Sequence, residues 1–377
     1  MSDSTATLPI IDIDVFRAGG PGASVECNKA ATAIITYGAL IVHDSRVREE
    51  DNGAFLDLIE DYFSQPLEDL EADEHPEWSY QVGVTLENTE KPKCAVDESC
   101  REVIARLDPA ERPLDITGHS PDPKCRFFWR MSEQPPYETA FPVVKAQNVV
   151  PNALHIKNRW TPIMQQWGQS MKNAVEDVAD MISTGLGIPP KTFSEAGRYG
   201  CHLLAPTASD LVKYGKKDTI LAGFHTDLNF LTIHGRSRYP GLNIWARNTG
   251  KRIPVKLPAT GSYLLVQAGK QLEHIAGGLI KAGFHEVVVN DATLKTIESR
   301  KAQFPDRPLI RISSTFFWHL SADYDLAPIP ELAAKAHERR AGAVNLGRTD
   351  VEEEAIYGTL KVGQQVQNEL KHIELMA

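Results

Sequence analysis

The sequence predicts a mixed α and β fold whose β part is a sandwich or barrel rather than a doubly wound sheet. Two patterns along the 377 residues support this prediction. Between residues 163 and 182, apolar residues recur at steps of three and four, which is typical of an amphipathic helix. Beyond Arg198 the period changes to two, and short β-forming runs follow one another with turns between them.

The composition indicates a folded, water-soluble protein. Hydrophobic residues make up 42% and charged residues 24%, and the length allows two or three domains or one enlarged core. A net charge of −10 opposes binding to nucleic acid or to an anionic membrane surface. No run approaches the ~20 apolar residues of a membrane span, and residues 1–9 lack the segments of a secretory signal. We therefore expect a cytoplasmic protein with neither nucleic acid nor membrane as a partner.

The cysteines are few and odd in number, and no close pair recurs to build a zinc knuckle. We expect all five to be reduced thiols. They are Cys27, Cys94, Cys100, Cys125 and Cys201.

The first third of the chain predicts alternating short elements. Residues 8–13 alternate as in a strand, and the glycine and proline cluster at 19–22 predicts a turn. Helical spacing follows from residue 24 to 37, a strand from 39 to 42 and a second helix from 51 to 63. Residues 68–150 carry much proline and charge with weak periodicity, so loops and short elements are expected there.

A long amphipathic helix is predicted to begin at Thr161 and Pro162, because threonine is an N-cap residue and proline suits the first helical position. Glycines at 185 and 187 and the prolines at 189 and 190 end it. Its methionines and tryptophans are expected to lie in the core. The apolar stripe consists of Ile163, Trp167, Met171, Val175, Val178 and Ile182.

Six short runs in the second half predict strands, and the chain after Pro328 is charged and helix-like. Turn residues at 240–241 and 248–250 separate some of the runs. The predicted strands are residues 219–224, 230–233, 242–245, 262–266, 284–289 and 309–317.

Two of these runs carry residues that could hold a metal ion. Residues two apart in a strand point to the same side, so His225 and Asp227 can aim at one point. His285, 60 residues later, lies in another strand-like run. Two histidines and one carboxylate with open positions suit non-haem Fe(II) and oxygen chemistry, whereas a structural zinc site prefers four protein ligands. Taken alone, His225 and Asp227 would be read as a solvated turn pair.

Arg311 and Ser313 form a second candidate site on the last predicted strand. The same spacing places the guanidinium and the hydroxyl on one side, with Ile310 and Ile312 on the other. A planar guanidinium beside a hydroxyl is suited to holding a carboxylate. An ordinary ion pair of Arg311 is the competing interpretation.

The order H-x-D, a distant H and then R-x-S resembles the iron- and 2-oxoglutarate-dependent oxygenases of the isopenicillin N synthase-like family. The resemblance covers most of residues 8–320 and is weak between 68 and 150. Within that span, the segments outside the three motifs that resemble the family are residues 8–12, 37–39, 63–66, 185–189, 264–273 and 277–278.

This resemblance implies a double-stranded β-helix (jelly-roll) core with flanking N-terminal and C-terminal helices. Residues 1–190 would be a helical and strand region packing on the core, residues 191–325 the core, and residues 326–377 a helical extension. Fe(II) would be held by His225, Asp227 and His285. The cosubstrate 2-oxoglutarate would chelate the iron and place its far carboxylate on Arg311 and Ser313.

The activity implied is that of a 2-oxoglutarate-dependent dioxygenase, which uses O2 and releases succinate and CO2 as it oxidises a C–H bond of a small molecule. Hydroxylation, desaturation and oxidative cyclisation all remain open. By family analogy we expect a compound of specialised metabolism, an amino-acid derivative being one candidate. The alternatives are an isopenicillin N synthase-like iron oxidase that uses no 2-oxoglutarate, a non-catalytic binding protein and a zinc-dependent hydrolase.

The sequence departs from the family pattern in three places. Glu286 follows the distal histidine where the family usually has arginine, and residues 290–308 are longer than usual. Residues 202–206 lack the tyrosine that helps to hold the cosubstrate, so either Arg311 would carry more of that binding or the cosubstrate would differ.

Other residues are candidates for a metal ligand or for the wall of the substrate pocket. His274 is a rival distal ligand, but a valine-rich strand follows His285 directly, as in the family. His234, beside a glycine, is expected to be structural. The candidates for the pocket wall are Tyr80, Arg126, Trp129 and Arg130, together with residues after His319.

Overall fold

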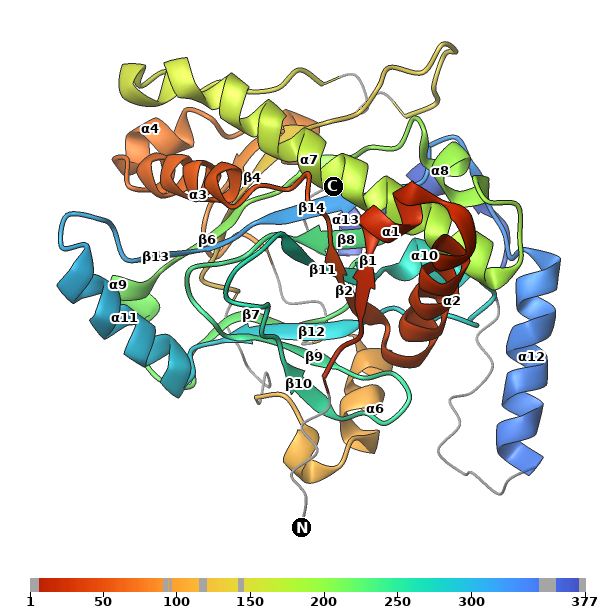
Figure 1. Ribbon diagram of the computed structural model, residues 1–377. Helices are drawn as coiled ribbons and strands as arrows, with labels where there is room; N and C mark the ends of the chain where they lie inside the picture. The colour runs from red at the N-terminus through yellow and green to blue at the C-terminus, as the bar shows by residue number, and fades with distance from the viewer. Residues whose placement is uncertain are drawn as a thin grey trace.

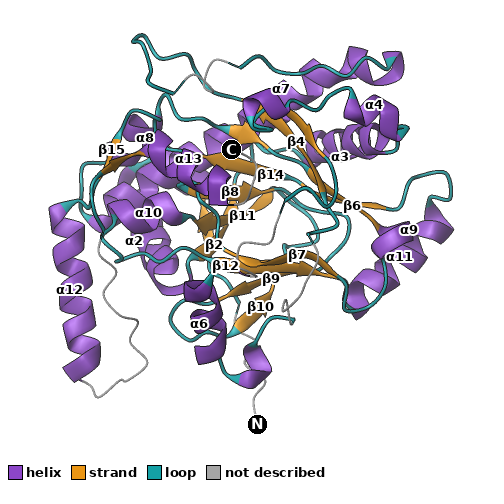
Figure 2. Ribbon diagram, turned by 180° about the vertical axis from the view of Figure 1, so that it is seen from behind, coloured by secondary structure: helices purple, strands orange, loops and turns teal. Residues whose placement is uncertain are grey.

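The structure is a computed structural model that describes residues 7–90, 94, 97–114, 121–141, 146–345 and 357–372. Its strands form a ten-stranded sheet, a four-stranded sheet and a two-stranded sheet (Figures 1 and 2). The ten-stranded sheet contains β1 (Ile10–Asp12), β2 (Ala39–His43), β3 (Gly83–Thr85), β4 (Cys125–Arg130), β5 (Leu203–Leu204), β6 (Thr207–Asp210), β8 (Leu231–His234), β11 (Tyr263–Ala268), β13 (Ile310–Ser313) and β14 (Thr315–Trp318). The four-stranded sheet contains β7 (Ile220–His225), β9 (Leu242–Trp245), β10 (Arg252–Pro254) and β12 (Phe284–Val288), and the last sheet pairs β15 (Asp325–Leu326) with β16 (Leu360–Lys361).

The strand order of the large sheet is β1-β2-β11-β8-β14-β5-β4-β6-β13, with β3 paired to β4. The order of the small sheet is β10-β9-β12-β7, so β7 is an edge strand. β1 and β2 pair in parallel, and β2 pairs antiparallel with β11, which joins the N-terminal strands to the central strands of the sheet. Whether residue 190 marks a domain boundary stays a prediction.

Helices cover the outer face of the large sheet. The described helices are α1 (Ile13–Ala18), α2 (Gly20–Tyr37), α3 (Glu49–Phe63), α4 (Leu67–Glu71), α6 (Glu98–Arg106), α7 (Leu154–Leu186), α8 (Thr192–Gly197), α9 (Leu211–Tyr214), α10 (Lys270–Ile275), α11 (Asp291–Gln303), α12 (Pro330–Asn345) and α13 (Val362–His372), with short 3-10 turns at Pro76–Trp78 and Pro109–Glu111. Figure 1 shows the long helix α7 crossing the molecule beside α2 and α3. Among the described residues, no helix has both the length and the apolar character needed to cross a bilayer.

Side chains of the central strands point alternately to the two faces of the large sheet, and these faces differ in character. Leu264 and Val266 of β11 pack into the main core with α2, α3 and α7, whereas Leu265 between them packs against residues of β9 and β10. On β8, Ile233 faces the helices, and the alternate residues Thr232 and His234 face the other way. The inner side of the large sheet is therefore the side on which polar residues gather.

The long helix begins seven residues before its predicted start, so the prediction that Pro162 lies in its first turn is wrong. α7 begins at Leu154, and Pro162 lies inside it. The reason is packing: Ile156 and Trp160 are fully buried, and Trp160 lies against Tyr62 and Phe127 at ring-centroid distances of 4.9 and 4.8 Å. Burying these side chains outweighs the loss of one backbone hydrogen bond at proline, a cost of about 3 kcal/mol.

Two further predictions need correction. The cluster at residues 19–22 is a junction between helices, because Gly19 takes a positive φ of 77° after α1 and Gly20 begins α2, with a proline in its first turn. Cys94 and Cys100 form a disulfide, so the expectation of five reduced thiols is wrong for this pair. The sequence places them only six residues apart at the start of α6, in the region where its periodicity is weakest.

Candidate metal centre

Three side chains meet at one point, two from adjacent strands of the small sheet and one from the segment that follows β7. β7 and β12 are antiparallel, and their register places His285 directly opposite His225, with 4.2 Å between the ring centroids. Asp227 follows β7, and its Oδ1 lies 3.7 Å from His225 Nε2 and 3.8 Å from His285 Nε2. Their potential ligand atoms all lie within 4.8 Å of one another. The structure thus brings together the three side chains that the sequence singled out as candidate ligands, His225, Asp227 and His285.

Backbone carbonyls orient both histidines. His225 Nδ1 donates to the carbonyl of Gly223 at 2.6 Å, and His285 Nδ1 lies 3.4 Å from the carbonyl of Gly283. Because a carbonyl accepts only, a proton on Nδ1 leaves Nε2 with its lone pair. Each imidazole therefore presents an acceptor nitrogen to the centre, which is the form that binds a metal ion.

A threonine holds the carboxylate. Thr232 Oγ1 donates to Asp227 Oδ2 at 2.6 Å, which leaves Oδ1 turned toward the two histidines. Thr232 was not singled out from the sequence. The available signal is a polar residue between Leu231 and Ile233 on a strand whose apolar positions face the core.

The electrostatics of the centre favour a neutral His225 and an ionised Asp227. Burial lowers the pKa of His225, and the neighbouring His285 acts in the same direction. Burial acts to raise the pKa of the Asp227 carboxyl, but His285, His225 and the Thr232 hydroxyl together outweigh it, so that this pKa is lowered. Two imidazole nitrogens and one carboxylate oxygen form a donor set that a divalent transition metal accepts.

Arg311 lies in the same inner layer on β13. Its Nη1 donates to Ser313 Oγ at 2.5 Å and its Nε to the carbonyl of Pro240 at 3.4 Å, and only 5% of its surface is exposed. In the described part of the chain, no carboxylate lies within ion-pair distance of this guanidinium. Burial lowers the pKa of Arg311 to about 10. A buried cation without a carboxylate is expensive, so this position favours an anionic ligand.

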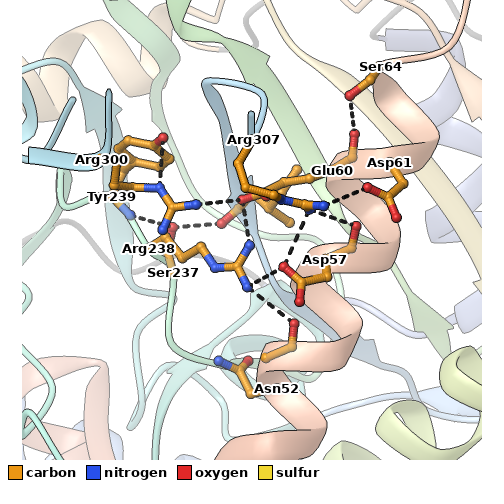
Figure 3. A network of polar contacts seen from close by, with 12 residues as sticks. Asn52, Asp57, Glu60, Asp61, Ser64, Ser237, Arg238, Tyr239, Arg300 and Arg307 are labelled. Atoms are coloured by element: carbon orange, nitrogen blue, oxygen red, sulfur yellow. Dashed lines mark hydrogen bonds and ion pairs between the residues drawn. The ribbon is translucent and has the colours of Figure 1, made fainter. Parts of the chain in front are cut away.

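An ion-pair network stabilises the connection between β8 and β9, whose Pro240 carbonyl accepts from Arg311. Figure 3 shows Arg238, Arg300 and Arg307 around the buried carboxylate of Glu60 on α3. Arg238 Nη1 and Arg307 Nη2 each lie 2.8 Å from a Glu60 oxygen, and Arg300 Nη2 lies 3.7 Å away. Arg238 belongs to the connection between β8 and β9 that supplies the Pro240 carbonyl.

A cavity of about 220 Å³ opens beside the metal centre. Arg126 lines it, as predicted, and so do His319 and residues of α13, whereas Tyr80, Trp129 and Arg130 do not belong to its described lining. Trp129 instead lies in the helix-covered core. The lining residues include His225, Asp227, His285, Ser313, Gln81, Glu90, Asp122, Lys124, Phe128, Leu203, His234, Thr315, Phe317, Val366 and Leu370.

The other histidines weighed from the sequence have other partners. His274 Nε2 donates to the carbonyl of Gly358 at 2.6 Å, so this nitrogen carries a proton and does not face the centre. Both ring nitrogens of His234 are within hydrogen-bond distance of side chains, those of Gln267 and Thr315. This arrangement agrees with a structural role for His234.

The structure shows what the residues that depart from the family pattern contact or form. Glu286 points away from His285 and accepts from Asn243 Nδ2 at 3.1 Å, and burial raises its pKa. The longer segment after β12 forms α11, which begins with a capping box between Asn290 and Thr293. Leu203 on β5 lines the cavity with an apolar side chain.

A second cluster of potential metal ligands is formed by Asp12, Asp14 and His43, and no pattern in the sequence indicates it. All three are half-buried, and the two carboxylates already accept hydrogen bonds from Val15 N and from Ser45 N and Oγ. The cap of α1 at Asp12 and the contact between Asp14 and Ser45 account for this cluster.

Comparisons with known proteins bear on this fold. No protein-family model matches the sequence. The peptide transporter imqJ of Aspergillus flavus is 26% identical over 182 residues, which covers 46% of this chain and 34% of that protein. Jasmonate-induced oxygenase 4 of Arabidopsis thaliana is 22% identical over 195 residues, which covers 49% of this chain and 50% of that protein. The chain therefore spans about a third to a half of the length of the curated relatives it matches.

Solved structures match over nearly the whole chain. T7H of Neurospora crassa in complex with alpha-KG has a TM-score of 0.70 at 17% identity and covers 98% of both chains. A putative 2OG-Fe(II) oxygenase family protein from Caulobacter crescentus has a TM-score of 0.69 at 17% identity, covering 98% of this chain and 100% of that one. JOX2 in complex with 2OG, Fe and JA has a TM-score of 0.56 at 17% identity and covers 87% of this chain and 79% of that one. The predicted mixed fold with a jelly-roll core and flanking helices is confirmed.

Proposed function

We propose that this chain, which has the fold of the 2OG-Fe(II) oxygenases, is an Fe(II)- and 2-oxoglutarate-dependent oxygenase that oxidises a C–H bond of a small molecule. The convergence of His225, Asp227 and His285 carries the proposal. A fold is shared by many activities, so the function has to rest on these side chains. The co-products would be succinate and CO2.

The residues present fit a ferrous ion. Two imidazole nitrogens and one carboxylate oxygen form the facial triad of non-haem iron, and they leave positions open for other ligands. The Gly223 carbonyl and the Thr232 hydroxyl hold His225 and Asp227 from outside, as carbonyl and hydroxyl partners do around metal ligands. When bound, the ion would couple the oxidative decarboxylation of 2-oxoglutarate to the activation of O2.

Arg311 and Ser313 would hold the far carboxylate of 2-oxoglutarate. The guanidinium is buried and lacks an ion-pair partner in the described residues, and Ser313 lines the cavity. Hydrogen bonds from a cation to a carboxylate contribute about 1.5–3 kcal/mol each. Because the Ser313 hydroxyl and the Pro240 carbonyl each bind one guanidinium N–H, the remaining N–H groups of Arg311 are left for a ligand.

The walls of the cavity would then position the substrate. Phe128, Phe317 and Leu203 supply apolar surface that excludes water from the centre. The solved neighbours bind small molecules, namely thymine, 5-formyluracil and JA. We propose a small molecule for this chain as well. An amino-acid derivative stays a prediction, and none of these named ligands is one.

The test is spectroscopic and does not need the substrate. Fe(II) and 2-oxoglutarate are added to the protein without O2, and we expect the visible charge-transfer absorption of an iron-keto acid chelate. The Asp227→Ala variant should lack it. A wild-type protein that binds Fe(II) without this absorption would contradict the use of 2-oxoglutarate. A screen of pyrimidines and jasmonate for substrate-dependent succinate release follows.

One observation favours an iron oxidase that does not use 2-oxoglutarate. The apolar Leu203 lines the cavity in the segment where the family has a cosubstrate-binding tyrosine. Product formation without any succinate would support that function instead.

A further inference from the structure

His319 follows β14 and borders the same cavity as the metal centre, yet it is not a candidate metal ligand. Only 7% of its surface is exposed. Its backbone N–H is engaged with His202 Nδ1 at 3.2 Å, so the main chain at this point is fixed independently of the imidazole.

Gln271 of α10 determines which ring nitrogen carries the proton. Gln271 is fully buried, and its Oε1 accepts from the backbone N–H of Leu320 at 2.9 Å. A backbone N–H can only donate, so this contact fixes the orientation of the amide. The amide Nε2 therefore faces His319 Nδ1, at 3.2 Å.

An amide nitrogen donates and does not accept, so Nδ1 of His319 has to be the acceptor. The neutral ring then carries its proton on Nε2. Burial lowers the pKa of His319 to about 4, against the opposing effect of Asp227, which keeps the ring neutral at physiological pH. Nε2–H is thus a fixed, uncharged donor.

This donor has no partner in the described part of the protein, and it is not sealed off. His319 Nε2 is not one of the fully buried side-chain atoms without a hydrogen-bond partner, so part of its surface is accessible. Because this nitrogen keeps accessible surface and its residue borders the cavity, the cavity is where a partner for the N–H can bind. A cavity wall with one fixed donor selects for an acceptor atom at that position.

We propose that His319 orients the substrate by donating its Nε2–H to a carbonyl oxygen of an uncharged group. The inference rests on the proposed function and names the chemistry that its substrate must offer. The two lysine and arginine side chains in the described lining of the cavity are already neutralised, because Lys124 Nζ lies 2.8 Å from Asp122 and Arg126 pairs with Glu90. A neutral donor and paired cations favour a ketone, amide or imide over a carboxylate.

The first experiment reads the tautomer. In 15N-labelled protein loaded with Zn(II) and 2-oxoglutarate, the ring signals of His319 are identified by their absence from His319→Gln. We expect a protonated Nε2 and an unprotonated Nδ1. The opposite tautomer, or a doubly protonated ring, would overturn the proposal.

The second experiment uses cyclohexanone and uracil as carbonyl probes, with cyclohexylammonium as a control that offers only donors. We expect at least one carbonyl probe to shift the Nε2–H signal and the control to leave it unchanged. Binding of that probe should weaken about tenfold in His319→Phe and by less than about threefold in His319→Gln, whose amide places a donor near the same position. Equal affinities in all three proteins, or no shift with either carbonyl probe, would overturn the proposal.

The affinity of His319→Phe for Zn(II) and 2-oxoglutarate, measured by calorimetry, separates this role from a merely structural one. We expect both affinities to remain within about threefold of the wild type. A loss of 2-oxoglutarate binding as large as the loss of probe binding would assign the donor to the cosubstrate and overturn the proposal. If wild-type protein bound neither Zn(II) nor 2-oxoglutarate, the proposed function would fail, and the tautomer and probe measurements on metal-free protein would still decide the role of His319.

Discussion

The rings of Phe224 and Phe284 lie face to face, with 4.5 Å between their centroids and 5° between their planes. Each precedes a histidine of the metal centre in an Ala-Gly-Phe-His sequence that occurs at residues 222–225 and again at 282–285. Neighbouring residues of a strand point to opposite faces, so the stacked rings lie behind the face that bears the histidines. The stack therefore supports the register in which His225 faces His285.

We predict that Phe284→Leu weakens metal binding without unfolding the protein. Loss of the stack loosens the β7 and β12 pairing, and support outside the ligands is worth about 10- to 100-fold in metal affinity. Calorimetric titration with Zn(II) measures the effect. Phe304→Leu, at an exposed position, is the control and should bind normally. Normal affinity in Phe284→Leu would show that the stack does not support the ligands.

His225→Ala, Asp227→Ala and His285→Ala should each abolish iron binding and turnover together, because two remaining ligands do not hold the ion. Metal content after loading with Fe(II) and desalting checks this. His274→Ala should retain iron, because its ring is bonded to the carbonyl of Gly358 outside the centre. Iron loss in His274→Ala with retention in His285→Ala would exchange the distal ligand.

Thr232→Val should lower metal affinity about tenfold, because Asp227 Oδ2 loses the hydroxyl that orients it at 2.6 Å. Thr232→Ser restores the hydroxyl and should bind close to normally. The comparison is made by competition with a coloured chelator. Equal affinity in both variants would mean that Asp227 is held by other contacts.

Arg311→Gln should weaken 2-oxoglutarate binding about 100-fold and leave metal affinity unchanged. The reason is the loss of a buried charge-assisted contact worth about 3 kcal/mol. Calorimetry with Mn(II) in place of Fe(II) measures both constants, and Arg106→Gln, at an exposed position, is the control. An unaltered 2-oxoglutarate constant would give Arg311 another task.

Glu60→Gln should reduce the free energy of unfolding by about 3 kcal/mol, because it leaves three arginines around an uncharged group. Urea denaturation followed by circular dichroism measures this. Asp57→Asn changes a half-exposed carboxylate of the same network and should cost less than about 1 kcal/mol. Equal losses in the two variants would argue against a special role of the buried acid.

The candidate site was more predictable than the elements around it. The spacing of His225 and Asp227 is a local signal, but it indicated a metal site only together with His285 and the pair Arg311 and Ser313. Their meeting with His285 depends on the register of β7 and β12, which the sequence expresses only through the order of the motifs. The tautomer of His319 could not be predicted at all, since it follows from a contact with Gln271, 48 residues away.

The elements that were not predicted likewise depend on contacts between residues far apart in the sequence or lack a clear apolar pattern. β4 was not predicted, because Phe127 and Trp129 are buried on pairing with other strands and lie in a region without clear periodicity. The helix at Asp291–Gln303 has a weak apolar pattern, and its capping box at Asn290 is the local signal that could have revealed it. α13 supplies Val366 and Leu370 to the cavity wall, far along the sequence from the metal centre, so no local pattern links them to it.

Along β8, β11, β13 and β14, alternate side chains pack on the helices or face the cavity, so the two sets are constrained by different requirements. Changes at outward positions such as Ile233, Leu264 and Ile312 alter the packing on the helices, whereas changes at inward positions such as Phe317 alter the chamber beside the ligands. A library restricted to inward positions other than the ligands and Arg311 should therefore diversify the range of accepted compounds while most of its members still fold.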